Sequence, residues 1–159
     1  MAVESMKKTV GERPFGWYRR YGPSVNTRRL VVEEGGFLYD SDAYNDELPY
    51  WVRVNDRSHL VVPYNLTAND SKFGGGGGFF TADDYFTFVK DRFDVLYKEG
   101  KTQRKMMSLG LHLRLIGHRS RAAGLERALD YIGSHKDVWF TRRIDSARHW
   151  LNTHPAPAR

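Results

Sequence analysis

A histidine closes the apolar run KMMSLGL, residues 105–111, and an arginine follows it closely. An imidazole ring titrates near neutral pH in general, so a histidine here can protonate a leaving nitrogen or accept a proton from water. Arg114 adds a fixed positive charge two positions later and is a candidate for substrate binding. A structural histidine bonded to a backbone carbonyl explains the same spacing. His112 therefore has two open interpretations, a catalytic and a structural one.

Two aspartates follow the apolar run FLY at residues 37–39. In an extended strand, Asp40 and Asp42 point to the same face, where two carboxylates can hold a metal, orient a histidine or bind a polar substrate. A strand-end turn in which each carboxylate caps local amides is an equally good interpretation. We keep both residues as candidates for substrate binding. The pair at residues 83–84, in contrast, is explained by helix capping.

The segment RPFGWYRRYG, residues 13–22, combines arginines with aromatic residues and glycines. A guanidinium binds a carboxylate or a carbonyl group through parallel hydrogen bonds. The segment therefore forms either one wall of a binding site or an aromatic patch that packs under a loop. A tryptophan after DELPY is open to the same two interpretations. The candidate substrate-binding residues of these two places are Arg13, Gly16, Trp17, Arg20 and Trp51.

Five consecutive glycines at residues 74–78 have the composition of a phosphate-binding loop but not its pattern. No Lys-Ser or Lys-Thr pair follows them, and no strand leads directly into them. We interpret the run as a flexible lid or a plain insertion, and we expect no cofactor.

Short apolar runs alternate with amphipathic segments along the chain. Apolar periodicity and capping residues predict helices at residues 24–36, 81–100, 120–135 and 144–154. The apolar runs predict strands at residues 37–40, 60–64, 106–112 and 138–143. Such alternation is typical of a parallel sheet covered by helices, which is an α/β fold. Because the carboxyl ends of parallel strands meet at one edge, we expect convergence there of Asp40, Asp42, Asn65 and His112.

Four strands do not close a barrel, and an eight-stranded (β/α) barrel takes about 250 residues. The 159 residues of this chain therefore correspond to about half a barrel. We take residues 1–159 as one partial domain with a disordered tail at 153–159. A half-barrel exposes strand edges and apolar surface, so we expect a homo-oligomer or pairing with a missing N-terminal half.

Composition narrows the classes of function. The 25 Lys and Arg residues exceed the 19 Asp and Glu residues, but they are scattered, which argues against nucleic-acid binding. The absence of cysteine from the sequence excludes disulfides and thiolate metal sites. No apolar run approaches the roughly 20 residues that a bilayer requires, and the N-terminus lacks a signal-peptide core. We expect a cytoplasmic protein that contacts no membrane.

Five longer stretches resemble the polysaccharide deacetylase superfamily, in particular its allantoinase-like branch. They are RPFGWY, NTRRLVVEEGGFLYDSDAYNDELPYW, LVVPYNLTAND, KMMSLGLHLRLIGHRSRAAGLERALDYI and VWFTRRIDSARHW. The resemblance implies the C-terminal half of a distorted (β/α) barrel that hydrolyses carbon–nitrogen bonds other than peptide bonds. The implied substrate is a small cyclic amide, such as allantoin, or an N-acetylated sugar.

The resemblance also implies roles for single residues. RPFG is similar to the family's arginine-proline-glycine motif, so Arg13, Pro14 and Gly16 would shape one wall of the groove. YDSD with Trp51 downstream is similar to an aspartate-tryptophan motif, which implies a supporting role for Asp40 or Asp42. The Leu-His pair at residues 111–112 is similar to the final leucine-histidine motif, whose histidine is a general acid.

The family's first motifs have no counterpart in this sequence. These motifs are an aspartate pair that supplies the base and a His-x-x-x-His pair that binds metal. We expect the chain to begin midway in such a protein, and the resemblance to the allantoinase-like branch implies catalysis without a metal. Two functions stay open: a part of an amide hydrolase that needs its missing half, and a non-catalytic half-barrel that binds ligands or partners.

Overall fold

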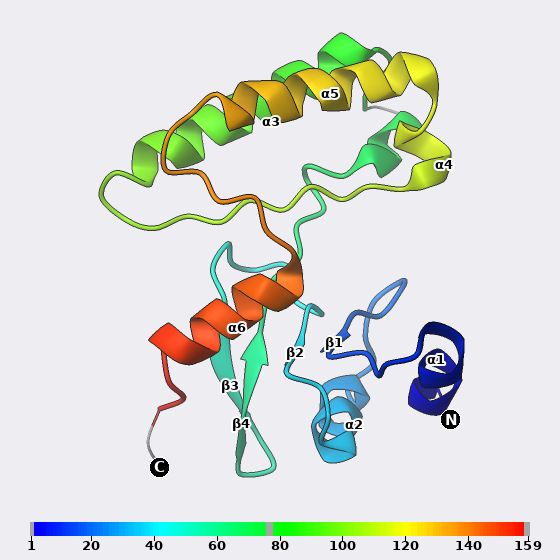
Figure 1. Ribbon diagram of the computed structural model, residues 1–159, viewed down its shortest axis with the longest axis vertical. Coiled ribbons are helices and arrows are strands. Elements are labelled where there is room, and N and C mark those ends of the chain that lie inside the picture. The colour runs from blue at the N-terminus through cyan, green and yellow to red at the C-terminus, as the bar shows by residue number, and fades with distance from the viewer. Residues whose placement is uncertain (1, 76–77, 158–159) are drawn as a thin grey trace. The chain divides into compact units, whose positions relative to one another are not determined.

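The computed structural model describes residues 2–75 and 78–157 (Figure 1). The chain divides into two compact units. We call Met1–Tyr64 with Thr141–Arg159 the sheet unit, and Asn65–Phe140 the helical unit. The expected single partial domain stays a prediction. Of the tail expected at 153–159, Thr153 still belongs to a helix, and residues 158–159 lie outside the described residues.

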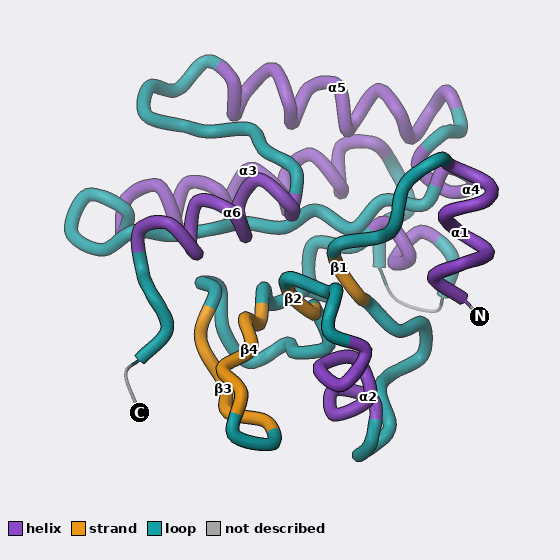
Figure 2. The backbone as a smooth tube through the Cα atoms, turned by 60° about the horizontal axis from the view of Figure 1, so that its bottom comes forward, coloured by secondary structure: helices purple, strands orange, loops and turns teal. Residues whose placement is uncertain are grey.

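The sheet unit holds a four-stranded sheet in the order β1-β2-β4-β3, drawn as orange segments in Figure 2. Three strands are parallel: β1 (Gly16–Trp17), β2 (Tyr39–Asp40) and β4 (Arg57–Val61). β3 (Tyr50–Val54) pairs with β4 in antiparallel fashion. The α/β class is confirmed, and the antiparallel edge strand is an addition that the apolar pattern alone did not predict.

The residue types at the turn explain the β3–β4 hairpin. Asn55 and Asp56 connect the strands, and both have positive φ angles, 46° and 60°. Two such residues make the type of two-residue turn whose twist matches a hairpin, and Asn and Asp tolerate this conformation better than most residues. The strand at 60–64 was predicted, but its pairing with residues before it was not.

Three helices belong to the sheet unit: α1 (Ala2–Val10), α2 (Thr27–Glu34) and α6 (Arg143–Thr153). α2 was predicted because Gly35 stops it, and Gly35 does adopt the left-handed conformation with φ 85°. α6 was predicted as well. α1 was missed, because most of its residues are polar and none of those that the structure describes is buried.

The helical unit is built around α3 (Ala82–Glu99) and α5 (Arg119–Gly133), which lie side by side in Figures 1 and 2. Both were predicted. Thr81 and Asp84 form a capping box at the start of α3. The short elements are α4 (Leu113–Ile116) and a 3₁₀ turn (Asp70–Phe73). The buried core of this unit contains Phe79, Tyr85, Val89, Phe93, Ile116, Ala128 and Ile132.

Two predicted strands are wrong. Residues 106–112 are extended but form only an isolated parallel bridge, between Asn69 and Gly110. Met107 and Leu109 pack against the helical core instead, so helices rather than a sheet bury the apolar run. Residues 138–143 also form no strand: Val138 packs on the same core, and α6 begins at Arg143. A continuous apolar run indicates that a segment is buried, but it does not show whether a sheet or helices bury it.

The close approach of α3 and α5 makes one glycine sensitive to substitution. A Cβ atom on Gly124 would lie 2.5 Å from the carbonyl oxygen of Ala82, which is a backbone atom that cannot move aside cheaply. We expect Gly124→Ala to lower the free energy of unfolding by about 1–3 kcal/mol despite alanine's better helix propensity. Gly133→Ala in the same helix meets nothing closer than 3.7 Å and should be neutral or slightly stabilising. Urea unfolding of both variants measures the difference; equal stability would contradict the packing argument.

Candidate active site

In the helical unit, the partly exposed side chain of His112 is hydrogen-bonded to the buried side chain of Asp70. The Nδ1 atom of His112 lies 2.6 Å from Oδ1 of Asp70, and the backbone N–H of His112 donates to Oδ2 at 2.7 Å. The Asp70 side chain is fully buried, whereas the histidine ring keeps 34% of its surface exposed. A carboxylate can only accept, so the Nδ1 atom carries the proton and Nε2 is the ring's other nitrogen. The ring is therefore neither sealed in the interior nor free to rotate.

The local backbone explains why Asp70 occupies this place. Asn69 precedes the 3₁₀ turn and its side chain accepts from the amide of Ser71, which fixes the start of the turn. The amide of Asp70 donates to the carbonyl oxygen of Gly110, two residues before the histidine. Asp70 Oδ2 also accepts from the amide of Ile116 at 3.2 Å. One carboxylate thus joins two segments that are 42 residues apart in sequence.

Sequence reasoning missed Asp70. The signal was present, because Asp70 ends LVVPYNLTAND, an apolar run with a polar end of the same kind as the run before Asp40. The charge of Asp70 also acts on the fully buried Tyr85. Burial, and then this charge, raises the pKa of Tyr85 to about 12. The phenol therefore stays neutral beside the carboxylate.

Apolar residues flank the histidine at the surface. Leu111 is 47% exposed and Leu113 is 90% exposed, and Arg114, the predicted substrate-binding residue, is exposed too. His112 is thus set in an apolar rim with one cation nearby. Such a surface suits an uncharged substrate whose polar group reaches the imidazole.

The predicted carboxylates Asp40 and Asp42 lie in the sheet unit, at the end of β2. Asp40 is buried and is held by two side chains: Arg28 donates through Nε at 2.7 Å and through a second nitrogen at 3.1 Å, and His59 Nε2 lies 3.1 Å away. Burial raises the pKa of Asp40, but the hydrogen bonds from His59 and Arg28 outweigh it and lower the pKa to about 2. Asp40 is therefore already paired within the protein, with Arg28 and His59.

Asp42 has a different environment. Its Oδ1 atom accepts from the backbone N–H of Arg19 at 2.8 Å, and its Oδ2 atom is buried with no hydrogen-bond partner among the described residues. Burial raises the pKa of Asp42, and the nearby negative charge of Asp40 adds to the rise. Of the two aspartates, Asp42 is the one with an unused acceptor.

The Asp40 network predicts a pH dependence of stability. The folded-state pKa of about 2 lies below the ordinary value of 3.8, so this carboxylate stabilises the fold above about pH 4 and loses that contribution as pH falls toward 2. The difference corresponds to about 2 kcal/mol. We expect Asp40→Asn to be less stable than the parent at pH 7, with the gap narrowing between pH 4 and pH 2. Urea unfolding across this range measures it, and a gap that stays constant with pH would contradict the assignment.

The structure places the other predicted residues of the sheet unit as follows. Arg13 donates to both carboxylate oxygens of Glu34, at 2.7 and 3.0 Å. Gly16 and Trp17 form β1, and a Cβ on Gly16 would collide with the ring of Tyr39. Trp51 donates through Nε1 to the carbonyl oxygen of His154. Arg20 lies against the ring of Tyr21, with its guanidinium carbon 4.4 Å from the ring centroid.

The structure brings Asp70 to His112, and it brings Asp42 close to the backbone that follows Trp17. The helical unit contains Asn65, Asp70, His112 and Arg114, and the other predicted substrate-binding residues belong to the sheet unit. The expected convergence of Asp40, Asp42, Asn65 and His112 on one rim stays a prediction. In the part of the chain that the structure describes, no group of three or more His, Asp or Glu side chains could hold a metal ion. No described helix is long and apolar enough to cross a bilayer.

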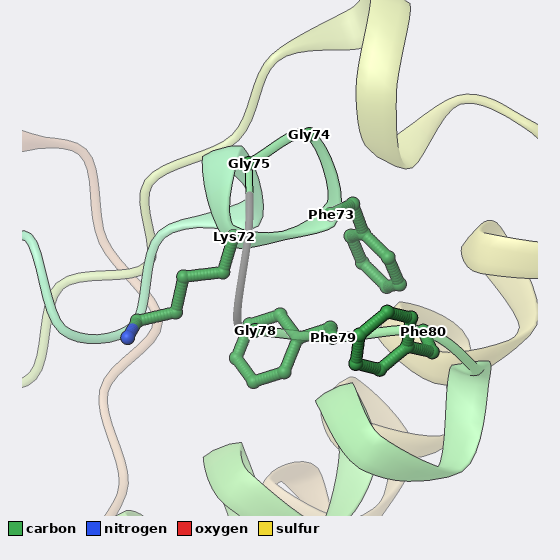
Figure 3. A pocket seen from close by; sticks show the side chains of 7 residues that line it. All are labelled: Lys72, Phe73, Gly74, Gly75, Gly78, Phe79 and Phe80. Atoms are coloured by element: carbon green, nitrogen blue, oxygen red, sulfur yellow. The ribbon is translucent and has the colours of Figure 1, made fainter.

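The glycine run borders a hollow of about 240 Å³ in the helical unit (Figure 3). The residues around it are Lys72, Phe73, Gly74, Gly75, Gly78, Phe79 and Phe80. The rings of Phe73 and Phe79 meet edge to face at 5.4 Å, and Lys72 points away from them. Residues 76–77 of the predicted lid or insertion lie outside the described residues. The hollow is lined by aromatic rings and backbone, and His112 does not contribute to it.

Comparisons with known proteins support the resemblance seen in the sequence. No family model matches the chain. A protein of Schizosaccharomyces pombe described as a polysaccharide deacetylase is 40% identical over 99% of this chain and 54% of its own length. The chain thus spans about half the length of this curated relative.

Solved structures extend the likeness to the fold. The crystal structure of Puue allantoinase matches with a TM-score of 0.92 and 53% identity, over 98% of this chain and 52% of that chain. A structure from Pseudomonas aeruginosa PAO1 described as a polysaccharide deacetylase matches with a TM-score of 0.92 and 52% identity, over the same shares. The coverage agrees with the predicted partial barrel. This chain is a homologue of polysaccharide deacetylases and of the Puue allantoinase, and it spans about half of such a protein.

Proposed function

We propose that this chain is one part of an amide hydrolase that cleaves carbon–nitrogen bonds other than peptide bonds. His112 is its proton donor, and Asp70 is the residue that positions it. The observation that carries the proposal is the 2.6 Å contact between His112 Nδ1 and the buried carboxylate of Asp70. This contact fixes the ring's orientation through Nδ1, so Nε2 is the nitrogen that would give the proton.

The proposed chemistry is general acid catalysis of leaving-group departure. After water has added to the amide carbon, the carbon–nitrogen bond breaks and the nitrogen must take up a proton to leave as a neutral amine. In its doubly protonated form His112 gives that proton from Nε2 and becomes the neutral ring, while Nδ1–H stays bonded to Asp70. The group that activates the water is not among the residues assigned here, so no step is derived for it or for a metal.

Two substrate classes follow from the relatives, a cyclic amide such as allantoin and an N-acetylated sugar. The candidate substrate-binding residues remain Arg13, Gly16, Trp17, Arg20, Asp40, Asp42, Trp51 and Arg114. Among them Asp42 has the strongest support, because one of its oxygens is buried and unpaired within the described residues. A cytoplasmic location, and oligomerisation or pairing with a missing half, stay predictions as well.

A chimera tests the proposal. This chain replaces the matching half of the Puue allantoinase in one protein and of the Pseudomonas aeruginosa protein in another, since both matches exceed half identity. Each chimera is assayed for release of allantoate from allantoin and of acetate from N-acetylglucosamine oligomers. Turnover by either chimera supports the hydrolase. Folded chimeras that turn over neither substrate would favour the alternative, a non-catalytic half-barrel that binds ligands or partners.

A further inference from the structure

We propose that three tyrosines of the sheet unit form a platform that binds an uncharged ring carrying an amide N–H group. Tyr18 directly follows β1, Tyr44 comes after β2, and Tyr64 comes after β4. Open parallel sheets bind ligands beyond the carboxyl ends of their strands. The inference rests on the proposed function, because rings of this kind occur in both substrate classes. We call these three residues the tyrosine platform.

The three rings contact one another directly. The centroids of Tyr18 and Tyr64 are 4.8 Å apart, and those of Tyr44 and Tyr64 are 6.3 Å apart. The hydroxyl groups of Tyr18 and Tyr44 lie within hydrogen-bond distance, at 3.3 Å. Residues from three different strand ends are thus joined into one aromatic cluster, at separations typical of favourable ring pairs.

A half-buried arginine holds the cluster in place. The guanidinium of Arg143, at the start of α6, lies 5.1 Å from the centroid of the Tyr64 ring. Its NH1 nitrogen donates to the hydroxyl of Ser41 and to the carbonyl oxygens of Val62 and Pro63, each at 3.0 Å. These acceptors follow β2 and β4, so one side chain fixes the geometry of both strand ends. A preorganised surface loses little entropy when a ligand binds.

The platform remains accessible. Tyr18 is 44% exposed and Tyr44 is 43% exposed, which is high for large aromatic side chains that also contact each other. Burial, and then the hydrogen bond with the Tyr44 hydroxyl, raises the pKa of Tyr18 further above its ordinary value of 10. The Tyr18 phenol is therefore neutral at physiological pH. A neutral surface of rings and hydroxyls suits an uncharged ring better than an anion.

Asp42 supplies an acceptor beside the platform. It is 8% exposed and accepts from the amide of Arg19, the residue after Tyr18. Its other oxygen has no hydrogen-bond partner in residues 2–75 and 78–157. Native proteins rarely leave a buried acceptor unpaired. We infer that an N–H group of the bound ring is its partner, which is why the ligand class includes an amide.

Binding to the 159-residue chain tests the platform without any need for turnover. The chain is titrated with allantoin in one arm and with an N-acetylglucosamine trimer in the other, and NMR follows the tyrosine ring signals. We expect saturable shifts in at least one arm, and the arm that shows them identifies the source of the ring. Tyr44→Ala and Tyr18→Ala should each weaken binding about fivefold, whereas Tyr44→Phe, which keeps the ring, should weaken it less.

Tyr21→Gly is the matched control. It removes a tyrosine ring that is 87% exposed in the same unit, at a position whose φ of 65° suits glycine. This variant should bind like the parent, and circular dichroism checks that every variant is folded. Unchanged affinity in folded Tyr44→Ala and Tyr18→Ala, or no saturable binding in either arm, would overturn the platform.

The result can be separated from the fate of the hydrolase. His118→Ala, at an exposed residue of the other unit, should bind with parental affinity. If binding depends on Tyr44 but the chimeras turn over neither substrate, the platform is supported and the hydrolase proposal fails. If the chimeras are active but their affinity for substrate does not depend on Tyr44, the hydrolase proposal is supported and the platform fails.

Discussion

Replacing His112 by alanine is expected to lower turnover of an active chimera by about 10²–10⁴-fold while the fold stays intact. The variant removes the only proton donor assigned to the leaving nitrogen. The ring is one-third exposed, so its loss opens Asp70 to water and should cost only about 1 kcal/mol of unfolding free energy. Steady-state kinetics and urea unfolding of the same preparations measure the two effects.

His118→Ala is the control for this experiment. His118 is exposed at the start of α5, and its side chain makes no capping hydrogen bond. Its removal should change neither turnover nor stability measurably. If His112→Ala retains more than a tenth of parental turnover, His112 is a structural histidine and the proposed chemistry is wrong.

Asp70→Asn is expected to lower turnover about 100-fold or more, because it reverses the hydrogen bond that holds the ring. An amide can present its N–H to His112, and the imidazole proton then moves from Nδ1 to Nε2. The arrangement in which both the backbone N–H and the Nδ1–H of His112 donate to residue 70 is then lost, although asparagine has nearly the same shape as aspartate. Nitrogen chemical shifts of the imidazole report the tautomer directly in the 159-residue chain, and the pH–rate profile of the chimera reports the functional consequence.

Asp70→Ala should act mainly on stability. It leaves the amide of His112 without its acceptor, whereas the amide of Ile116 keeps the carbonyl oxygen of His112, so we expect the unfolding free energy to fall by about 1–3 kcal/mol. Asp94→Asn is the control in the same unit, since Asp94 binds Lys90 and Tyr131 at a partly exposed surface. It should change stability by less than about 1 kcal/mol and leave the tautomer untouched. A parental tautomer in Asp70→Asn would show that Asp70 does not position the ring.

The helices were predictable because their determinants are local. Tyr85, Val89 and Phe93 recur at helical spacing, and a capping box and a terminal glycine mark the ends of α3. Strands depend on partners elsewhere in the chain, so the apolar run at 106–112 was assigned to a sheet that does not form there. The hairpin at residues 50–61 was missed for the same reason, although Asn55 and Asp56 marked its turn.

The site was predictable only in part. His112 was identified from its residue type, its place after an apolar run and its similarity to a leucine-histidine motif. Its partner Asp70 was not, because the two residues are 42 positions apart and only the folded backbone brings them together. Asp40 illustrates the opposite case: its position suggested a site, yet Arg28 and His59 already satisfy it. Spacing locates charged groups, but it does not show which of them are already paired.

The dependence of rate on the leaving group tests the central claim most directly. Parent and His112→Ala chimeras are compared on a series of acetanilides whose amine leaving groups range from poor to good. A proton donor matters most when the departing nitrogen is strongly basic. We predict that the rate difference between the two proteins is large for the poorest leaving group and shrinks steadily toward the best one. A difference that is the same for every leaving group would contradict proton donation by His112.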